Sequence, residues 1–272
     1  MEDPNPPVEN GRLRWRGVVF LAAGLLFIGW LLNTPPGLFG KLDALGYAVC
    51  HRIEVRSFHI QQRQLPLCSR CSGMFMGAVV GLIFQAAIAP RRTGSPPWYL
   101  WAAFGIMAAA FAIDGVNSYF HLFPGAPSLY EPHNHLRLIT GTGMGFVIAA
   151  ALYPAYNQTV WAASDARPAF SGWISFLGLL GLGSILDLLV MTENPLILYP
   201  LALASSAGVL ILLVLIYSMV WIMVFRLDNS FHTVRQLSFP LAGGFFLALL
   251  QIAAFNWLRF YLTGTWGGFV IG

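Results

Sequence analysis

Charged residues are scarce in this sequence, and lysine is almost absent. Only 10% of the 272 residues are charged, 57% are apolar, and the mean hydropathy is +0.67. A soluble domain carries about a quarter charged residues, so lipid must cover much of this chain. Lys41 is the only lysine among 15 basic residues. The net charge of +4 does not indicate a nucleic-acid partner, because the basic residues flank apolar segments and form no basic domain.

Several widespread catalytic and nucleotide-binding motifs are also absent. The sequence contains no G-x-G-x-x-G, no P-loop, no H-E-x-x-H and no serine nucleophile elbow. No reaction therefore follows from a motif of this kind, and function has to be inferred from the placement of reactive side chains.

Seven apolar runs are each long enough to cross a bilayer, which takes about 20 residues of helix. Backbone in lipid must form helices or a closed barrel, and these runs are too long and unbroken for barrel strands. We therefore predict an all-α fold, a polytopic transmembrane helical bundle with about seven spans. The predicted spans are 16–33, 72–90, 97–115, 138–154, 171–191, 196–225 and 238–260.

These spans divide the chain into four segments. Residues 1–11 are rich in proline and asparagine and are predicted to form a disordered tail. Residues 12–33 form a retained first span, because no signal-peptide cleavage site follows them. Residues 34–154 contain a Cys/His-containing loop folded over spans two to four, and residues 155–272 contain spans five to seven.

The basic residues also predict an orientation. A cytoplasmic N-terminus places eight basic residues on the cytoplasmic side and seven on the other. Five of those seven lie in the motifs described below, where function can retain them, and setting them aside leaves eight against two. We expect a multi-pass protein of the cell membrane with a cytoplasmic N-terminus and an extracytoplasmic Cys/His face.

Good metal ligands gather in two polar segments, residues 34–71 and 116–137. These segments hold eight of the nine cysteine and histidine residues, and only His232 lies elsewhere. Spans two and three form a hairpin between the segments, so both segments lie on the same face of the membrane. This one-sided clustering is the strongest chemical signal in the sequence.

The densest group is Cys50-His51 followed by Cys68-Ser-Arg-Cys71. A C-x-x-C pair presents two thiolates to one ion, and a Cys or His pair from a preceding loop completes a tetrahedron. We predict a metal site formed by Cys50, His51, Cys68 and Cys71, with zinc as the first choice. Three of these ligands with a histidine from elsewhere would serve equally, and iron or copper also suits such ligands.

A redox interpretation competes with the metal site. Cys68 follows Pro66 at the start of span two, where a helix N-terminus lowers the pKa of a thiol. A C-x-x-C at a helix start is also typical of thiol–disulfide oxidoreductases, and Cys50 would then be a third, shuttling thiol. The purely structural alternative is a disulfide or a zinc ion that only ties the loop to span two.

Charged residues inside apolar runs provide a second signal, because buried carboxylates in membranes are usually paired or functional. Asp114 ends span three, and Arg137 opens span four with Asn134 on the same helix face. We predict these three as catalytic residues beneath the metal site, with Asp114 as base and Arg137 binding an anionic group. Alternatively, an Asp114–Arg137 pair only locks two spans together. Asp187 lies deep in span five without an obvious partner and is either a proton-handling or a packing residue.

Glycines recur every four residues in spans two and four, at Gly73, Gly77 and Gly81 and at Gly141 and Gly145. Small-residue faces of this kind let transmembrane helices approach closely. We therefore predict that these two spans pack together and hold the motif-bearing helices near one another.

The motifs together resemble a known family. The sequences CHRIEVRSF (residues 50–58) and PLCSRCSG (residues 66–73) are similar to the signature of a prokaryotic family of predicted membrane proteins, the domain of unknown function 2085. Family members also carry an Asp-Gly followed by Asn-x-x-Arg-x-x-Thr-Gly, which resemble residues 114–115 and 134–141 here. The resemblance covers roughly residues 40–150 and implies no activity.

These observations favour an integral membrane protein with a Cys/His zinc site at one face. Metal-assisted chemistry on a lipid-borne or small substrate is the leading hypothesis. The alternatives are a membrane thiol–disulfide oxidoreductase and a non-enzymatic transporter or scaffold subunit, whose partners would be other membrane proteins. The stretch before Asn134 is longer than the family norm, so His121 and His133 are less favoured as ligands than the four residues above.

Overall fold

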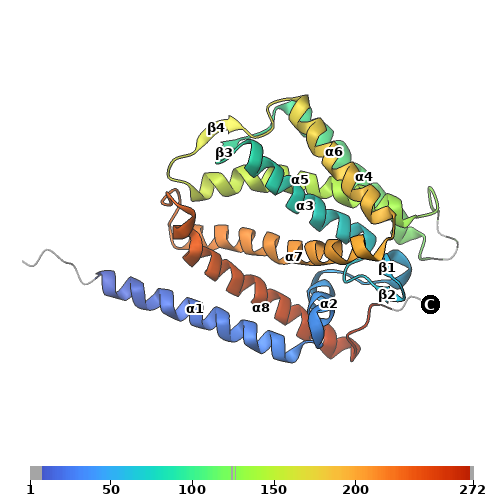
Figure 1. Ribbon diagram of the computed structural model, residues 1–272, viewed down its shortest axis with the longest axis horizontal. Coiled ribbons are helices and arrows are strands. Elements are labelled where there is room, and N and C mark those ends of the chain that lie inside the picture. The colour runs from blue at the N-terminus through green and yellow to red at the C-terminus, as the bar shows by residue number, and fades with distance from the viewer. Residues whose placement is uncertain (1–7, 124, 126, 270–272) are drawn as a thin grey trace, which may run out of the picture.

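The protein is a bundle of long helices, seen in a computed structural model that describes residues 8–123, 125 and 127–269 (Figure 1). Seven of its helices are long and apolar enough to cross a membrane, which confirms the predicted all-α transmembrane fold. Of the predicted tail, residues 1–7 lie outside the described residues. The long helices are α1 (Val8–Asn33), α3 (Ser69–Ile88), α4 (Trp98–Phe120), α5 (Asn134–Val160), α6 (Trp173–Met191), α7 (Pro195–Val224) and α8 (Ser238–Thr263).

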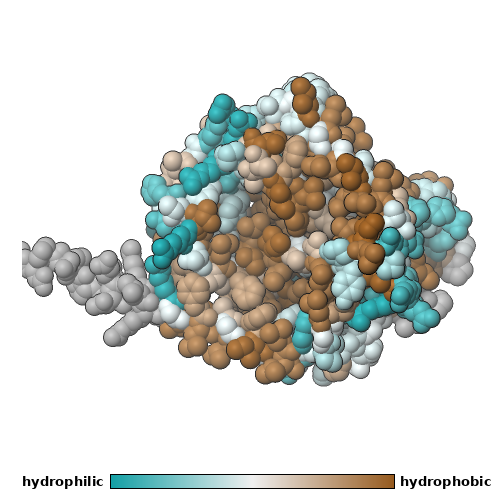
Figure 2. Space-filling model, viewed as in Figure 1, coloured by the Kyte–Doolittle hydropathy of each residue, from teal (hydrophilic) through white to brown (hydrophobic). Residues whose placement is uncertain are grey.

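The two ends of the bundle carry the short elements. At one end, here called the motif end, lie α2 (Gly37–Val49), the 3-10 turn Glu54–Arg56 and a hairpin of β1 (His59–Ile60) and β2 (Arg63–Gln64). At the opposite end, β3 (Arg92–Gly94) pairs in parallel with β4 (Asp165–Pro168), and a 3-10 turn spans Val234–Leu237. Figure 2 shows a hydrophobic band between hydrophilic patches at these two ends, as a membrane protein requires.

Helix α2 was not expected from the sequence, which predicted a loop over residues 34–71. Its 13 residues extend about 20 Å, too short to span the hydrocarbon core. The helix forms because Phe39, Leu42 and Leu45 lie on one face and pack into the main apolar cluster of the bundle. It ends at Cys50, whose backbone is extended.

Helices α3 and α5 pack more extensively than any other pair of described elements, and the predicted glycine seam is confirmed. A methyl group added at Gly141 would overlap the backbone oxygen of Arg70, and one at Gly145 would overlap the backbone of Met74. On the facing helix, Gly73 lies equally close to the backbone of α5. The seam therefore brings the start of α3 directly against the start of α5.

Helices α4 and α5 extend further toward the motif end than predicted, to Phe120 and from Asn134. Their polar residues are satisfied inside the protein, so the helices need not end where the apolar runs do. Asp187, inside α6, is also satisfied within the protein, because Thr142 on α5 donates a hydrogen bond of 2.6 Å to its carboxylate. This contact could not be read from the sequence, because it joins residues 45 positions apart.

Candidate metal centre

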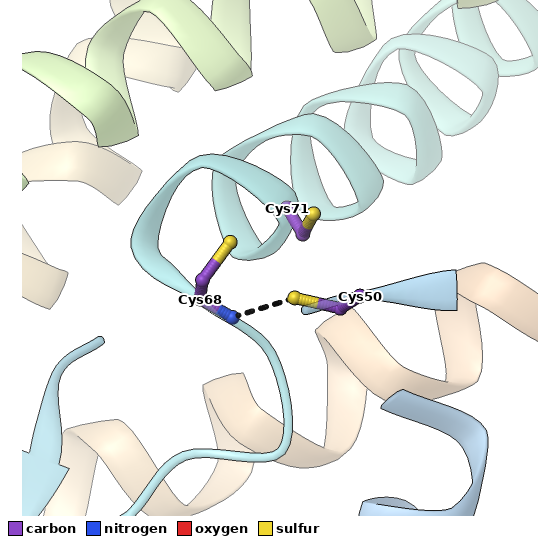
Figure 3. A group of neighbouring side chains, drawn as sticks. All are labelled: Cys50, Cys68 and Cys71. Carbon is purple, nitrogen blue, oxygen red and sulfur yellow. Dashed lines mark hydrogen bonds between the residues drawn. The ribbon is translucent and has the colours of Figure 1, made fainter. Parts of the chain in front are cut away.

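Three thiols converge at the motif end. Cys50 ends α2, Cys68 immediately precedes the first residue of α3, and Cys71 lies in the first turn of α3. Their sulfur atoms all lie within 4.8 Å of one another, and Figure 3 shows the three side chains beside one another at the start of α3. Two segments separated by a hairpin therefore bring the chain's only three cysteines to a single site.

Two backbone amides donate hydrogen bonds to the sulfur of Cys50. The amide of Cys68 donates to the Cys50 sulfur at 3.3 Å (Figure 3), and the amide of Arg52 donates to it at 3.4 Å. Hydrogen bonds of this kind stabilise sulfur ligands and fix their direction. Leu67 and Val209 pack against Cys50, whose side chain is buried, so the sulfur lies in a mostly apolar environment.

The thiols titrate together. Hydrogen bonds from Cys50 and Cys71 hold the pKa of Cys68 well below its usual range, whereas the hydrogen bond to Cys68 and burial raise the pKa of Cys50 to about 12. Without a cation, the cluster therefore accommodates one thiolate readily and a second only with difficulty. Three thiolates at this spacing require a cation between them.

His51, the fourth predicted ligand, is placed differently. Its ligand atoms are not among those that lie within 4.8 Å of one another, and its side chain is exposed. Its carbonyl oxygen accepts hydrogen bonds from Arg259 and from the amide of Phe269, each at 3.1 Å. The structure thus brings three of the four predicted ligands together and leaves His51 at the rim.

Asp114 is buried on α4 and pairs with Arg70, not with the expected Arg137. Arg70 donates from Nε at 3.1 Å and also from Nη2 to one carboxylate oxygen, while Tyr130 donates to the other oxygen at 2.9 Å. The expected pairing with Arg137 is corrected here, because the glycine seam places the first turn of α3, with Arg70, closer to Asp114. Thr140 adds a fourth contact at 3.4 Å.

Arg137 is buried and turns toward neutral partners. Its Nη1 donates to Asn134 at 2.9 Å, and its Nε approaches the Ser118 hydroxyl at 3.4 Å. The predicted shared face of Asn134 and Arg137 is therefore present. Asn134 also donates to the carbonyl oxygen of Val55 at 3.2 Å. This bond ties the motif loop, the segment 50–68 between α2 and α3, to α5.

A pocket of about 400 Å³ lies beside the thiols. Its polar lining consists of Cys68, His51, Tyr119 and three arginines, Arg56, Arg70 and Arg137. Asp114 is not part of the lining, so the charged side chains that face an incoming molecule are the three arginines. The arrangement can bind an anion within reach of the Cys68 side chain.

Sequence reasoning missed two contributors to the site. Arg70 lies inside the C-x-x-C motif and was treated as a spacer, although a single charge in the first turn of a span signals a partner. Arg259, from α8, donates to the carbonyl oxygens of Tyr47 and Cys50 at 2.8 and 2.6 Å. A lone arginine near the end of an otherwise apolar run is the signal that could have identified it.

Comparison with known proteins agrees with the resemblance seen in the sequence. Residues 50–151 match the family described as "Predicted membrane protein (DUF2085)", so α1 and α6–α8 lie outside the match. An uncharacterized protein of Methanocaldococcus jannaschii is 29% identical over 145 residues, which are 53% of this chain and 86% of that protein. An uncharacterized protein of Methanothermobacter thermautotrophicus is 29% identical over 101 residues, 37% of this chain and 81% of that protein. No solved structure matches.

Proposed function

We propose that this multi-pass membrane protein binds one thiophilic metal ion, zinc in the first place, through Cys50, Cys68 and Cys71. The observation that carries the proposal is the convergence of three sulfur atoms within 4.8 Å of one another. A tetrahedral zinc ion with Zn–S distances of about 2.3 Å separates its sulfur ligands by about 3.8 Å. Small rotations of the cysteine side chains bring the three sulfurs to that spacing.

Three thiolates leave one coordination position, and two groups compete for it. His51 is adjacent to Cys50 and borders the same pocket as Cys68, so a rotation of the loop would bring its imidazole to the ion. If His51 is the fourth ligand, the site is closed and structural. If it is not, the open position faces the arginine-lined pocket and favours metal-assisted chemistry on a lipid-borne or small substrate.

The chain's own groups suit the open-site alternative. Arg56 and Arg137 face the pocket and bind an anionic group, while Asn134 holds Arg137 in place through its side-chain oxygen. Asp114 has both carboxylate oxygens occupied by hydrogen bonds, which favours a positioning role through Arg70 over the role of base. When bound, the metal would supply Lewis-acid activation of an oxygen.

Metal content decides between these proposals. The protein is purified in detergent without a histidine tag, and metal per chain is measured by mass spectrometry alongside a free-thiol count. We expect about one zinc per chain, lost in Cys68→Ser and Cys71→Ser and retained in Arg137→Gln, which changes no ligand. Loss of zinc in His51→Ala would establish the closed site. Absence of metal with two thiols missing from the count would overturn the metal proposal.

A redox function is the second candidate, and the lowered pKa of Cys68 at the start of α3 favours it. A Cys68 thiolate would attack a disulfide in a partner, forming a mixed disulfide and expelling one partner thiolate. The Cys71 thiolate would then attack Cys68 of the mixed disulfide, which releases the second partner thiolate and leaves a Cys68–Cys71 disulfide. Trapping thiols in intact cells tests this candidate. A Cys68–Cys71 pair that changes oxidation state with added oxidant and reductant would support it, and a fixed state would exclude it.

We also propose that the motif end is extracytoplasmic. Exposed arginines Arg16, Arg91, Arg167, Arg226 and Arg235 gather at the opposite end, which the positive-inside rule assigns to the cytoplasm. The last described residue, Phe269, lies at the motif end beside His51. A fluorescent protein fused to the C-terminus, which matures only in the cytoplasm, should therefore remain dark, and bright cells would reverse the orientation.

A further inference from the structure

The three arginines of the pocket are more than a metal site requires. The metal ion itself uses only Cys68 from the pocket wall, and the proposed function assigns Arg56 and Arg137 an anionic group whose chemistry it leaves unnamed. They come from the 3-10 turn of the motif loop, from α3 and from α5, so three separate elements direct cationic groups at one cavity of about 400 Å³.

Positive charge in this pocket exceeds negative charge. Asp114 pairs with Arg70, but none of the ion pairs among the described residues involves Arg56 or Arg137. Their hydrogen-bond partners are neutral: Arg56 donates to the carbonyl oxygen of Ser118 at 2.8 Å, and Arg137 donates to Asn134. Buried charge without a counter-charge is unfavourable, and Arg137 is only 6% exposed.

Two other arginines of the motif loop are neutralised within the chain by a carboxylate. Arg52 and Arg63 both pair with Asp43, at 2.8 and 2.7 Å. Arg56 lies between them in sequence, yet it points into the pocket and has no carboxylate partner within the described residues. The difference indicates that the counter-charge of the pocket arrives with a ligand.

Each pocket arginine also retains a nitrogen for that ligand. In the hydrogen bonds of the described residues, Arg70 uses Nε and Nη2, Arg137 uses Nε and Nη1, and Arg56 uses only Nη2. Nη1 of Arg70 faces Gly115, which also borders the pocket. Guanidinium groups bind phosphate oxygens through paired N–H donors.

We infer that this pocket is a binding site for a phosphate monoester group, held by Arg56, Arg70 and Arg137 beside the metal-binding cysteines. Two guanidinium groups in excess of Asp114 match the charge of nearly −2 that such a group carries. The remaining wall contains Ile53, Leu122 and Phe269, and the cavity is several times larger than phosphate alone. The apolar part of the wall fits an organic portion attached to the phosphate.

The position of the pocket suits an amphiphile as the source of the phosphate. It lies where α3 and α5 begin and α4 ends, and the exposed aromatic rings of Tyr119 and Phe123 pack edge to face nearby, with their centroids 5.3 Å apart. Aromatic side chains gather at the level of lipid headgroups. A soluble phosphate ester entering from the water phase shares the same chemistry, and the experiment below separates the two sources. The inference rests on the proposed function only in placing a metal ion beside the pocket, because phosphate binding itself needs only the three arginines.

Calorimetric titration of the detergent-solubilised protein tests the inference. The probes are inorganic phosphate, a short-chain phosphatidic acid below its micellar concentration, and a short-chain phosphatidylcholine as the comparator without a dianionic group. We expect saturable binding of phosphatidic acid, weakened at least about tenfold in Arg137→Gln. Arg63→Gln is the matched control, because it removes an arginine of the same loop region that pairs with Asp43, and it should bind normally.

A second pair of variants blocks the pocket without changing its charge. A side chain at Gly115 would enter the cavity next to Arg70, whereas Gly105, on the same helix, has nothing within 4 Å of an added Cβ. Gly115→Leu should therefore lose phosphate binding, while Gly105→Leu should retain it. Because both variants add the same residue to α4, a difference between them reports the pocket and not the helix.

The outcomes separate the sources and the proposals. Binding of phosphatidic acid at least about tenfold tighter than inorganic phosphate identifies a lipid source, and equal affinities identify a soluble one. Absence of saturable phosphate binding by the unmodified protein, or undiminished binding in both Arg137→Gln and Gly115→Leu, would overturn the inference. Metal content is measured on the same samples: normal zinc without phosphate binding rejects the pocket alone, and phosphate binding without zinc rejects the metal site alone.

Discussion

The two ends of the bundle contain the same kind of ion pair in opposite settings. At the motif end, Arg70 pairs with Asp114, whose side chain is 1% exposed. At the opposite end, Arg167 pairs with Asp165 at 2.7 Å, and these side chains are 73% and 33% exposed. The comparison teaches that the burial of charged side chains, and not their number, distinguishes the end that carries a site from the end that only faces water.

The buried pair has consequences that the exposed pair lacks. Arg70 connects α3 to α4 and lies in the same helical turn as Cys71, so the carboxylate of Asp114 positions the start of α3 and with it two of the thiols. Asp165 and Arg167 lie two residues apart on β4, and the further ion pair of Asp165 with Arg92, at 3.5 Å, joins β4 only to its partner strand β3 and to none of the thiols. Mutations at the two ends should therefore differ in size, and they should differ in their effect on the thiol site.

The largest effect is expected from Asp114→Asn. This change leaves the largely buried Arg70 guanidinium, whose side chain is 19% exposed, without a counter-charge, and breaking such a pair lowers the free energy of unfolding by about 3–5 kcal/mol. Thermal unfolding followed by tryptophan fluorescence in detergent measures the change. The double variant Arg70→Met with Asp114→Leu should recover much of the loss, because an apolar pair carries no buried charge. A double variant as unstable as the single one would show that the ion pair is not the cause.

A smaller effect is expected where the seam between α3 and α5 is widened. In Gly141→Ala, the added methyl group overlaps the backbone of Arg70, and overpacking of this kind reduces stability by about 1–3 kcal/mol. Gly24→Ala in α1 is the matched control, because an added Cβ there meets nothing within 4 Å. Equal unfolding temperatures for the two variants would contradict the role of the seam. Metal content should fall in Gly141→Ala alone.

The sequence predicted those parts of the molecule that depend on local composition. The spans followed from the length of the apolar runs, and the glycine seam followed from a four-residue repeat that places small residues on one helix face. The thiol cluster followed from the C-x-x-C spacing and from Cys50 on the same side of the membrane. Each of these inferences needed only short-range information and the dimensions of a bilayer.

The contacts between helices were not predictable in the same way. The sequence offered only Arg137 as the partner of Asp114, and the choice of Arg70 depends on how closely α3 approaches α5. Arg259 and Phe269 reach the Cys50 segment from more than 200 residues away, and no local pattern encodes such a distance. Helix α2 was missed because it is short and has charged residues at Lys41 and Asp43.

A modest effect is expected from Asn134→Ala, at the surface of the motif end. The variant loses the hydrogen bonds to Arg137 and to the Val55 carbonyl, together worth about 1 kcal/mol because Asn134 is only half-buried. Its effect on phosphate affinity should be larger than its effect on stability, because Arg137 loses the group that orients it. Titration and thermal unfolding of the same preparation measure both quantities. A loss confined to stability would limit Asn134 to tying the loop to α5.

The smallest effect is expected from Asp165→Asn, at the opposite end. Hydrogen bonds from Arg167 lower the pKa of Asp165 to about 2. A carboxylate with a lowered pKa stabilises the fold above its unfolded pKa of about 3.9, and this contribution is lost as the pH falls through about 2. Since the pair is solvent-exposed, its contribution is small at any pH.

At pH 7, Asp165→Asn should therefore leave the unfolding temperature, the metal content and the phosphate affinity unchanged. Between pH 4 and pH 2, the unmodified protein should lose slightly more stability than the variant, because only the unmodified protein has this carboxylate to protonate. Unfolding temperatures measured across both pH ranges, beside Asp114→Asn, complete the comparison of the two ends. If Asp165→Asn lowered stability as much as Asp114→Asn at pH 7, burial would not be what separates the site from the opposite end of the bundle.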